Sequence, residues 1–384
     1  MTTKTEMIMR VDRSGSAAGL GVLLAEMEEN PQVAGILLLA CDQNGFQPGS
    51  VDRLLVGLTK PVFGGIFPEI LHGNEKLSLG TIAVGLRHTP RLLTVPRLSD
   101  PSFDFDAFLD GHAEALGQGQ TMFVWVDGLA ARISGLMESI FHIFGLEQNY
   151  IGGGAGSLSF EQKPCLFTNQ GLIGDAAVLA VLDIPSGIGV SHGWTSISGP
   201  HKVTHSEGAV IHSLNWRPAF DVYREAIAQA TGQTVTRENF FALSKSHPFG
   251  IIRLGDEMVV RDPIVVREDG GLVCVGEVPQ ESHVDILTGD PISLVEAARR
   301  AVALGQAAMK TAALGSAEPP PFTFFVDCIS RVLFLEDDFD RELAAVQSPG
   351  VPLVGVLSLG EVANSGHSYL EFYNKTAVVG ILGV

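Results

Sequence analysis

Polar side chains follow two apolar stretches near the end of the chain. Asp327, Cys328 and Arg331 end one stretch, and Glu361 and Asn364 follow the next. In open α/β sheets, ligands bind at the carboxyl ends of strands. An arginine near a glutamate also forms ion pairs, and such a pair is costly when it is buried without another purpose. Two interpretations stay open: a satisfied Arg331–Glu361 salt bridge, or a polar cradle for a small molecule.

Cys328 offers a chemical alternative. A thiolate nucleophile needs a nearby base or cation. Arg331 could lower the pKa of the thiol, and His367 lies in the same loop as Glu361. The rest of such a constellation cannot be assembled from the sequence. We therefore expect the protein not to be an enzyme, with a cysteine-dependent enzyme as the alternative.

Four of the eleven histidines lie in one stretch of the chain. They are His192, His201, His205 and His212. On a helix, the second and third would form a metal-binding pair. Pro200 and the alternation after it favour a strand, along which four residues span about 13 Å, so we expect no metal site. A haem iron needs only one histidine, so all four stay candidate axial ligands.

Two glycine motifs resemble catalytic or phosphate-binding signatures. Residues 189–193 match Gly-x-Ser-x-Gly, but a nucleophile elbow needs a helix directly afterwards, and residues 194–200 cannot form one. We therefore expect a turn at the edge of a strand. Residues 152–156 lack the lysine and hydroxyl residue of a phosphate-binding loop. Tight packing against a neighbouring backbone is the favoured interpretation, with ligand contact as the alternative.

Three stretches that share one plan must position these residues. Residues 33–86, 121–182 and 322–382 each run from a strand through a polar turn, a helix and a glycine-bearing strand to a closing hairpin. The strands are continuous apolar runs, which is typical of sheets covered on both faces. The sequence predicts a mixed α/β (α+β) fold with two domains, built from repeated strand–helix–strand–hairpin units.

Turn and cap signals give further boundaries. Asp290 precedes a predicted helix over 291–314, and a second helix is predicted over 218–230. Asparagine and glycine favour hairpin turns at 168–171 and 373–376. Residues 183–210 are rich in glycine, serine, proline and histidine. They are the best candidate for a domain boundary.

Charge and composition exclude several classes of function. The net charge is −18 and no basic cluster interrupts it, which argues against nucleic acid and anionic membranes as partners. No apolar run approaches the 18 residues of a membrane span, and residues 1–13 lack the apolar core of a secretory signal. The four cysteines form no Cys-x-x-Cys pair. We expect reduced, mostly buried thiols and a cytoplasmic protein.

The order of several motifs resembles the FIST family of sensory proteins. They are Gly152–Gly156, Arg261–Ile264, Gly276–Pro279, Cys328–Arg331, Gly360–Glu361 and Tyr373–Thr376. Together the matching motifs cover most of the chain from about Val33. In one place the chain departs from the family, because the stretch from Gly64 to Glu69 lacks the expected serine.

The resemblance implies an N-terminal FIST domain over 1–185 and a C-terminal one over 186–384. It also implies a ligand site, for which strand-end placement and family motifs favour five residues: Cys328, Arg331, Glu361, Asn364 and Asn374. An amino acid is one ligand to expect. Because the two FIST halves use up this chain, the output is expected from a separate protein, such as a histidine kinase or a cyclic-dinucleotide enzyme.

Stand-alone FIST proteins are also similar to haem-containing nitric-oxide sensors that control a histidine kinase. For those, haem is the implied cofactor, and a histidine would bind the iron. A sensory role with a small ligand is therefore the leading hypothesis. A non-catalytic adaptor is a further alternative.

Overall fold

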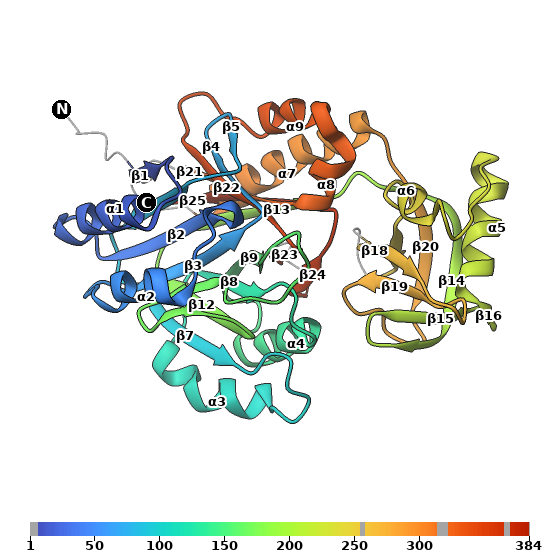
Figure 1. The fold of residues 1–384 in the computed structure, drawn as a ribbon, viewed down its shortest axis with the longest axis horizontal. Coiled ribbons are helices and arrows are strands. Elements are labelled where there is room, and N and C mark those ends of the chain that lie inside the picture. The colour runs from blue at the N-terminus through green and yellow to red at the C-terminus, as the bar shows by residue number, and fades with distance from the viewer. Residues whose placement is uncertain (1–6, 254–257, 313–321, 365–368, 384) are drawn as a thin grey trace.

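The computed structural model describes residues 7–253, 258–312, 322–364 and 369–383. It has two parts, a body of three six-stranded sheets and a seven-stranded barrel beside it (Figure 1). Helices lie on the outside of the body, and the sheets mix parallel and antiparallel pairs. The predicted mixed α/β fold is confirmed.

The body consists of three units with one plan, as the sequence predicts. The first unit contains β1 (Ile8–Asp12), α1 (Ala17–Glu29), β2 (Gly35–Cys41), η1 (Asp42–Asn44), α2 (Pro48–Val56), β3 (Val62–Phe67), β4 (Glu69–His72), β5 (Glu75–Leu77) and β6 (Thr81–Leu86). The second contains β7 (Arg91–Pro96), α3 (Phe105–Leu116), β8 (Thr121–Asp127), α4 (Ile133–Phe144), β9 (Asn149–Ala155), β10 (Leu166–Thr168), β11 (Gly171–Ile173) and β12 (Ala176–Leu182).

The third unit is interrupted by the barrel. It begins with β13 (Ser186–Ser191) and resumes after the barrel with α7 (Pro291–Ala312), β21 (Phe322–Cys328), α8 (Ile329–Leu335), η2 (Glu336–Asp338), α9 (Phe339–Ala345), β22 (Leu353–Ser358), β23 (Glu361–Ala363), β24 (Glu371–Tyr373) and β25 (Ala377–Leu382). Asp290 accepts a hydrogen bond from the Ser293 amide at 2.7 Å, which fits its predicted place at the start of α7.

The units exchange their hairpins in a cycle. The strand orders are β1-β6-β2-β3-β10-β11, β7-β12-β8-β9-β23-β24 and β13-β25-β21-β22-β4-β5. The first sheet therefore takes its last two strands from the second unit, the second from the third, and the third from the first. Each sheet thus needs strands from two units.

This exchange corrects one predicted hairpin. Residues 168–171 do turn between paired strands, β10 and β11. Residues 373–376 instead connect β24, which pairs with β23, to β25, which pairs with β13 and β21 in another sheet. The left-handed residue of this turn is Lys375, with a φ of 51°, and not the asparagine that the sequence favours. The turn carries the chain between sheets rather than back along one.

The glycine-rich stretch of β9 packs tightly, as the favoured interpretation predicts. A Cβ on Gly152 would lie 1.9 Å from the Val124 carbonyl oxygen of the parallel neighbour β8. The equivalent Gly355 of β22 would place one 2.2 Å from the Phe325 oxygen. The glycines therefore permit close strand contact in the body. Residues 189–193 likewise form the end of β13 and the connection to the next strand, with no helix after them.

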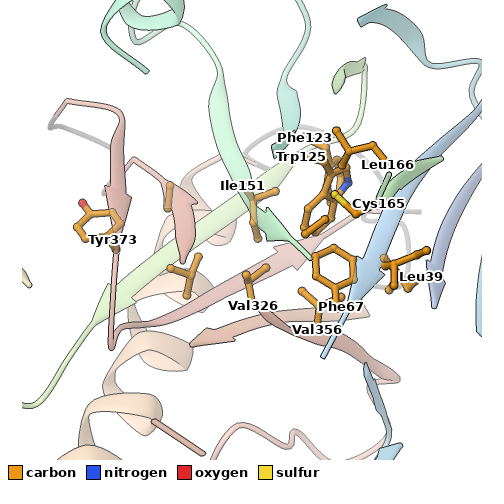
Figure 2. Packing of buried hydrophobic residues seen from close by; sticks show 14 of the residues in the cluster. Leu39, Phe67, Phe123, Trp125, Ile151, Cys165, Leu166, Val326, Val356 and Tyr373 are labelled. Carbon is orange, nitrogen blue, oxygen red and sulfur yellow. The ribbon is translucent and has the colours of Figure 1, made fainter. Parts of the chain in front are cut away.

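The centre of the body lies where the three sheets face one another. Aromatic rings from all three units meet there, and Figure 2 shows Phe67, Phe123 and Trp125 close together. The centroids of Phe67 and Trp125 are 5.1 Å apart, and those of Phe123 and Phe324 are 5.4 Å apart. These large buried rings join the units into one core.

The barrel is inserted between β13 and α7. It comprises β14 (Thr195–Glu207), β15 (Val210–Leu214), β16 (Arg217–Pro218), α5 (Ala219–Thr231), α6 (Phe240–Ser244), β17 (Phe249–Ile251), β18 (Val259–Val266), β19 (Leu272–Val275) and β20 (His283–Thr288). Pairing of β14 with both β20 and β15 closes it. The predicted domain boundary after residue 185 falls between the second and third units, and exchanged hairpins cross it. It stays a prediction.

Candidate functional site

A small pocket lies where the barrel meets the body. Its volume is about 90 Å³, and both parts line it. The mouth carries apolar side chains that are partly exposed: Phe160 and Leu333 of the body, and Phe241 of the barrel. The polar residues of the wall are Lys245, Asp262, Cys328, Ser330, Asn374 and Lys375. The pocket therefore combines a mainly apolar surface with a few polar groups in its wall.

Asn374 is the most unusual of these polar groups. Its side chain is 1% exposed, and neither Oδ1 nor Nδ2 has a hydrogen-bond partner among the residues that the structure describes. Its backbone oxygen accepts a hydrogen bond from the Thr376 hydroxyl at 2.7 Å, which holds the turn in place. Leaving a buried polar group unpaired costs about 1–3 kcal/mol. The amide is thus ready to bind a molecule that supplies both a donor and an acceptor.

Lys375 connects the body to the barrel beside this amide. Its Nζ lies 3.1 Å from Asp262 Oδ2 and donates to the Lys245 carbonyl oxygen at 3.0 Å. Burial raises the pKa of Asp262, and the nearby Lys375 ammonium opposes that rise. The ammonium also lies 5.3 Å from the centre of the Trp194 ring, a cation–π contact. One buried cation and one buried carboxyl group therefore flank Asn374.

Cys328 lines the pocket as a protonated thiol. Its Sγ lies 3.1 Å from the Ser330 hydroxyl. Burial raises the pKa of the thiol far above its usual value, and the charge of Glu361 raises it further. A thiolate nucleophile needs the opposite environment. His367, the other member of the alternative constellation, lies outside the described residues.

Glu361 and Asn364 lie behind the pocket and support it. Glu361 is completely buried and accepts hydrogen bonds from the Ser358 hydroxyl at 2.9 Å and the Thr376 amide at 3.3 Å. Burial raises the pKa of Glu361 to about 8. Asn364 accepts a hydrogen bond from the Tyr150 amide at 3.0 Å, which fixes β23 beside β9.

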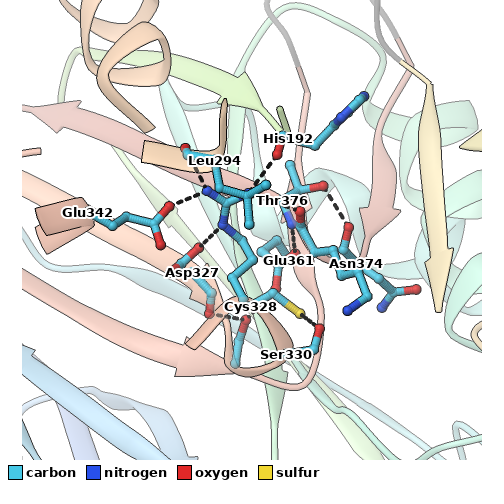
Figure 3. A network of polar contacts seen from close by, with 12 residues as sticks. His192, Leu294, Asp327, Cys328, Ser330, Glu342, Glu361, Asn374 and Thr376 are labelled. Carbon is cyan, nitrogen blue, oxygen red and sulfur yellow. Dashed lines mark hydrogen bonds and ion pairs between the residues drawn. The ribbon is translucent and has the colours of Figure 1, made fainter. Parts of the chain in front are cut away.

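Arg331 is fully buried and contacts Asp327, Glu342 and His192, which Figure 3 shows in one polar network. Its Nε lies 3.1 Å from Asp327 Oδ1, and its Nη2 pairs with Glu342. The remaining contacts are to three backbone oxygens, those of His192, Lys375 and Leu294. The Arg331–Glu361 salt bridge, one of the two open interpretations, is not formed between these described residues, because Asp327 and Glu342 of α9 provide the carboxylates. Burial raises the pKa of Asp327 and of Glu342.

The structure thus divides the five predicted ligand residues. Cys328 and Asn374 line the pocket, and the other three lie behind it. Sequence reasoning missed Asp262 and Lys375, although both lie within motifs that carry the family resemblance. Asp262 lies in the barrel and Lys375 in the last turn of the body, so only the fold brings them together.

His192 lies on the link between β13 and β14, outside this pocket. Burial lowers the pKa of His192 to about 3, with the charges of Arg331 and Arg300 adding to the effect. Its Nδ1 accepts a hydrogen bond from the Trp194 amide at 2.9 Å, which leaves the ring proton on Nε2. An iron ligated through Nε2 needs that proton on Nδ1. This arrangement does not fit an axial ligand.

The other three histidines belong to the barrel. His201 contacts the Ser198 hydroxyl with one ring nitrogen at 3.0 Å and the Asn215 amide with the other at 3.2 Å. The rings of His205 and His212 stack at 4.7 Å. None of these three lines the pocket. Within residues 7–253, 258–312, 322–364 and 369–383, no group of three or more histidine, cysteine, aspartate or glutamate side chains could hold a metal ion.

Comparison with protein families gives two adjacent matches. The model of the FIST N domain matches residues 36–217, and the model of the FIST C domain matches residues 219–364. Comparison with curated proteins gives no match. No helix in the described parts of the chain is both long enough and apolar enough to span a bilayer.

Proposed function

Because the chain belongs to the FIST family, whose domains sense small ligands in signal transduction, we propose that its ligand binds in the pocket between the body and the barrel. The single observation that carries the proposal is the Asn374 amide, which is buried in the pocket wall with both polar atoms unpaired among the described residues. Structural polar groups are rarely left this way, since nearly all buried ones have partners. A bound molecule would supply those partners.

The chemistry of the wall favours an amino acid with an apolar side chain. The Asn374 Nδ2 donates to the ligand's carboxylate, and Oδ1 accepts from its amino group. The buried pair of Asp262 and Lys375 adds a charge of each sign beside the amide. The apolar side chain lies towards Phe160 and Leu333 at the mouth. Each added hydrogen bond contributes about 0.5–1.5 kcal/mol to binding.

We propose that this binding serves signalling and not catalysis. The protonated state of the Cys328 thiol supports this, since a cysteine enzyme needs a thiolate. The output would come from a separate protein in the cytoplasm, such as a histidine kinase or a cyclic-dinucleotide enzyme.

Haem and nitric oxide are the weaker proposal for the ligand. His192 holds its ring proton on the nitrogen that would bind iron, and the other three candidates lie in the barrel away from the pocket. We therefore derive no step through haem. An absorption spectrum recorded after adding haemin and removing the excess tests this: a Soret band that shifts with dithionite and nitric oxide would favour haem.

The amino-acid proposal is tested by a pair of asparagine variants. Thermal unfolding of the full chain is followed with each of the twenty L-amino acids. We expect one or more apolar amino acids to raise the melting temperature of the native protein. In Asn374→Ala the loss of two hydrogen bonds should weaken binding about 5- to 150-fold, while the melting temperature without ligand stays the same or rises.

Asn364→Ala is the matched control. Asn364 is equally buried, at 1% exposed, but its side chain is hydrogen-bonded to the Tyr150 amide. We expect this variant to melt earlier and to keep the ligand affinity of the native protein. Loss of affinity in Asn364→Ala, with Asn374→Ala binding normally, would contradict the assignment of the site.

A further inference from the structure

Two short links join the barrel to the body. Residues 192–194 lead from β13 into β14, and residues 289–290 lead from β20 into α7. Figure 1 shows the barrel standing beside the body. The links lie side by side, since Thr195 pairs with Thr288 where they enter the barrel, and a Cβ on Gly289 would be 2.7 Å from the Trp194 ring. A pair of adjacent links between two compact parts has the geometry of a hinge.

Arg331 holds both links from the body side. Its Nη1 donates to the His192 carbonyl oxygen at 2.7 Å, and its Nη2 donates to the Leu294 carbonyl oxygen at 3.0 Å. The first acceptor lies on one link and the second in the α7 turn that follows the other. The guanidinium is itself fixed by Asp327 and Glu342 in the body. One buried side chain therefore sets where both links leave the body.

The same guanidinium contacts a residue of the pocket wall, Lys375. Its Nη1 also lies 3.2 Å from the carbonyl oxygen of Lys375, and the Trp194 indole donates to that oxygen at 3.1 Å. Through its Nζ, Lys375 is bonded to Asp262 and to the Lys245 carbonyl oxygen in the barrel. Lys375 thus contacts the hinge with its backbone and the barrel with its side chain, and it lines the pocket.

The pocket is small, so ligand binding should move the barrel relative to the body. A volume of about 90 Å³ is small, since ligand pockets usually measure about 300–1,000 Å³. An amino acid with a branched apolar side chain must widen the pocket. Because one wall belongs to the body and the other to the barrel, widening the pocket separates the two parts at its mouth. The two links at the hinge would bend to allow this motion.

We propose that ligand binding turns the barrel about these two links, with Arg331 as the positioning residue that couples the pocket to the hinge. This inference rests on the proposed function of the same pocket. The barrel position then reports occupancy to a partner, provided that the partner binds the two positions with different affinity.

The test measures the distance between the two parts directly. Spin labels are placed in the full chain at Glu114→Cys on α3 and Gln229→Cys on α5, both exposed positions, and pulsed EPR gives the distance distribution. The native cysteines are all buried and should stay unlabelled. L-leucine is the probe ligand. We expect it to shift the distribution of the native protein.

A tryptophan pair tests the coupling without any ligand. Trp194→Phe keeps the ring but removes the indole donor to the Lys375 oxygen, and it should broaden the distance distribution. Trp125→Phe is the matched control, because Trp125 is equally buried in the body and its indole nitrogen has no hydrogen-bond partner in the part of the chain that the structure describes. Arg331→Lys keeps the charge but loses the planar guanidinium, and it should broaden the distance distribution more. If Arg331→Lys does not fold, Trp194→Phe alone tests the coupling.

The outcomes separate this inference from the proposed function. If L-leucine raises the melting temperature but leaves the distance unchanged, the hinge proposal is overturned and the binding site stands. If L-leucine does not bind, the proposed ligand class fails, and the tryptophan pair still decides the hinge. Equal distributions in Trp194→Phe and Trp125→Phe would then overturn the coupling, and a broader one in Trp194→Phe would support it.

Discussion

Glu361 shows how burial controls the protonation of a single residue. Its carboxyl group has no exposed surface and meets the neutral donors Ser358 and Thr376. Burial raises the pKa from the ordinary 4.5 to about 8 in the folded protein. Between these values the folded chain holds a proton that the unfolded chain has released. The contribution of Glu361 to the free energy of unfolding is therefore fully present below about pH 4.5, and it is lost as the pH rises through 8.

We predict that Glu361→Gln reduces this pH dependence. One proton contributes a slope of up to about 1.4 kcal/mol per pH unit. Urea unfolding at pH 5.5 and 7.5 should show the native protein losing stability between the two, and the variant losing less. The slope should not vanish, because burial also raises the pKa of Asp327 and Asp262. Exposed Glu114→Gln is the control, and equal slopes in all three proteins would refute the prediction.

At the scale of the element, the close contact between β8 and β9 depends on the absence of a side chain. A Cβ on Gly152 would lie 1.9 Å from the Val124 oxygen, so Gly152→Ala must push two central strands apart. We predict a loss of about 3 kcal/mol or more in the free energy of unfolding. Gly111→Ala on α3 has nothing within 4 Å and should stabilise by about 1 kcal/mol. Equal melting temperatures for the two variants would count against this account.

The elements themselves could be predicted from the sequence because their signals are local. Continuous apolar runs marked the central strands of all three units, and the start of α7 followed from Asp290. The partners of the closing strands could not be predicted. The turn at Asn374 has hairpin chemistry, yet β24 and β25 lie in different sheets, since exchange of hairpins between units is decided by the assembled core.

Prediction of the site succeeded where the signal is local, and it failed where the assembled fold decides which residues meet. Strand-end placement found Cys328 and Asn374, which do line one pocket. It also suggested that Arg331 pairs with Glu361, whereas the helix α9 brings Glu342 to it. Asp262 was not predicted as a site residue because it lies in the inserted barrel. No short sequence pattern encodes the position of the barrel against the body.

At the scale of the whole molecule, the barrel should be dispensable for folding but not for binding. Its two links lie next to each other at Trp194 and Gly289. We predict that a chain with residues 195–288 replaced by a short glycine–serine linker keeps the three-sheet body. Circular dichroism and cooperative thermal unfolding would show this, and the response to apolar amino acids should be lost because Asp262 is gone. A chain without a cooperative transition would contradict the prediction.

The exchanged hairpins also set the order in which a nascent chain can complete its sheets. β4 pairs with β5 at once but with β22 at His72 and Val354, so the ribosome must add roughly 280 residues before β4 meets this second neighbour. At about 5–20 residues per second, that interval lasts about 15–60 s. During it, the first unit carries a strand with an open edge, which is where chains associate wrongly. We expect synthesis of this protein to depend on chaperones that shield such edges until the last unit emerges.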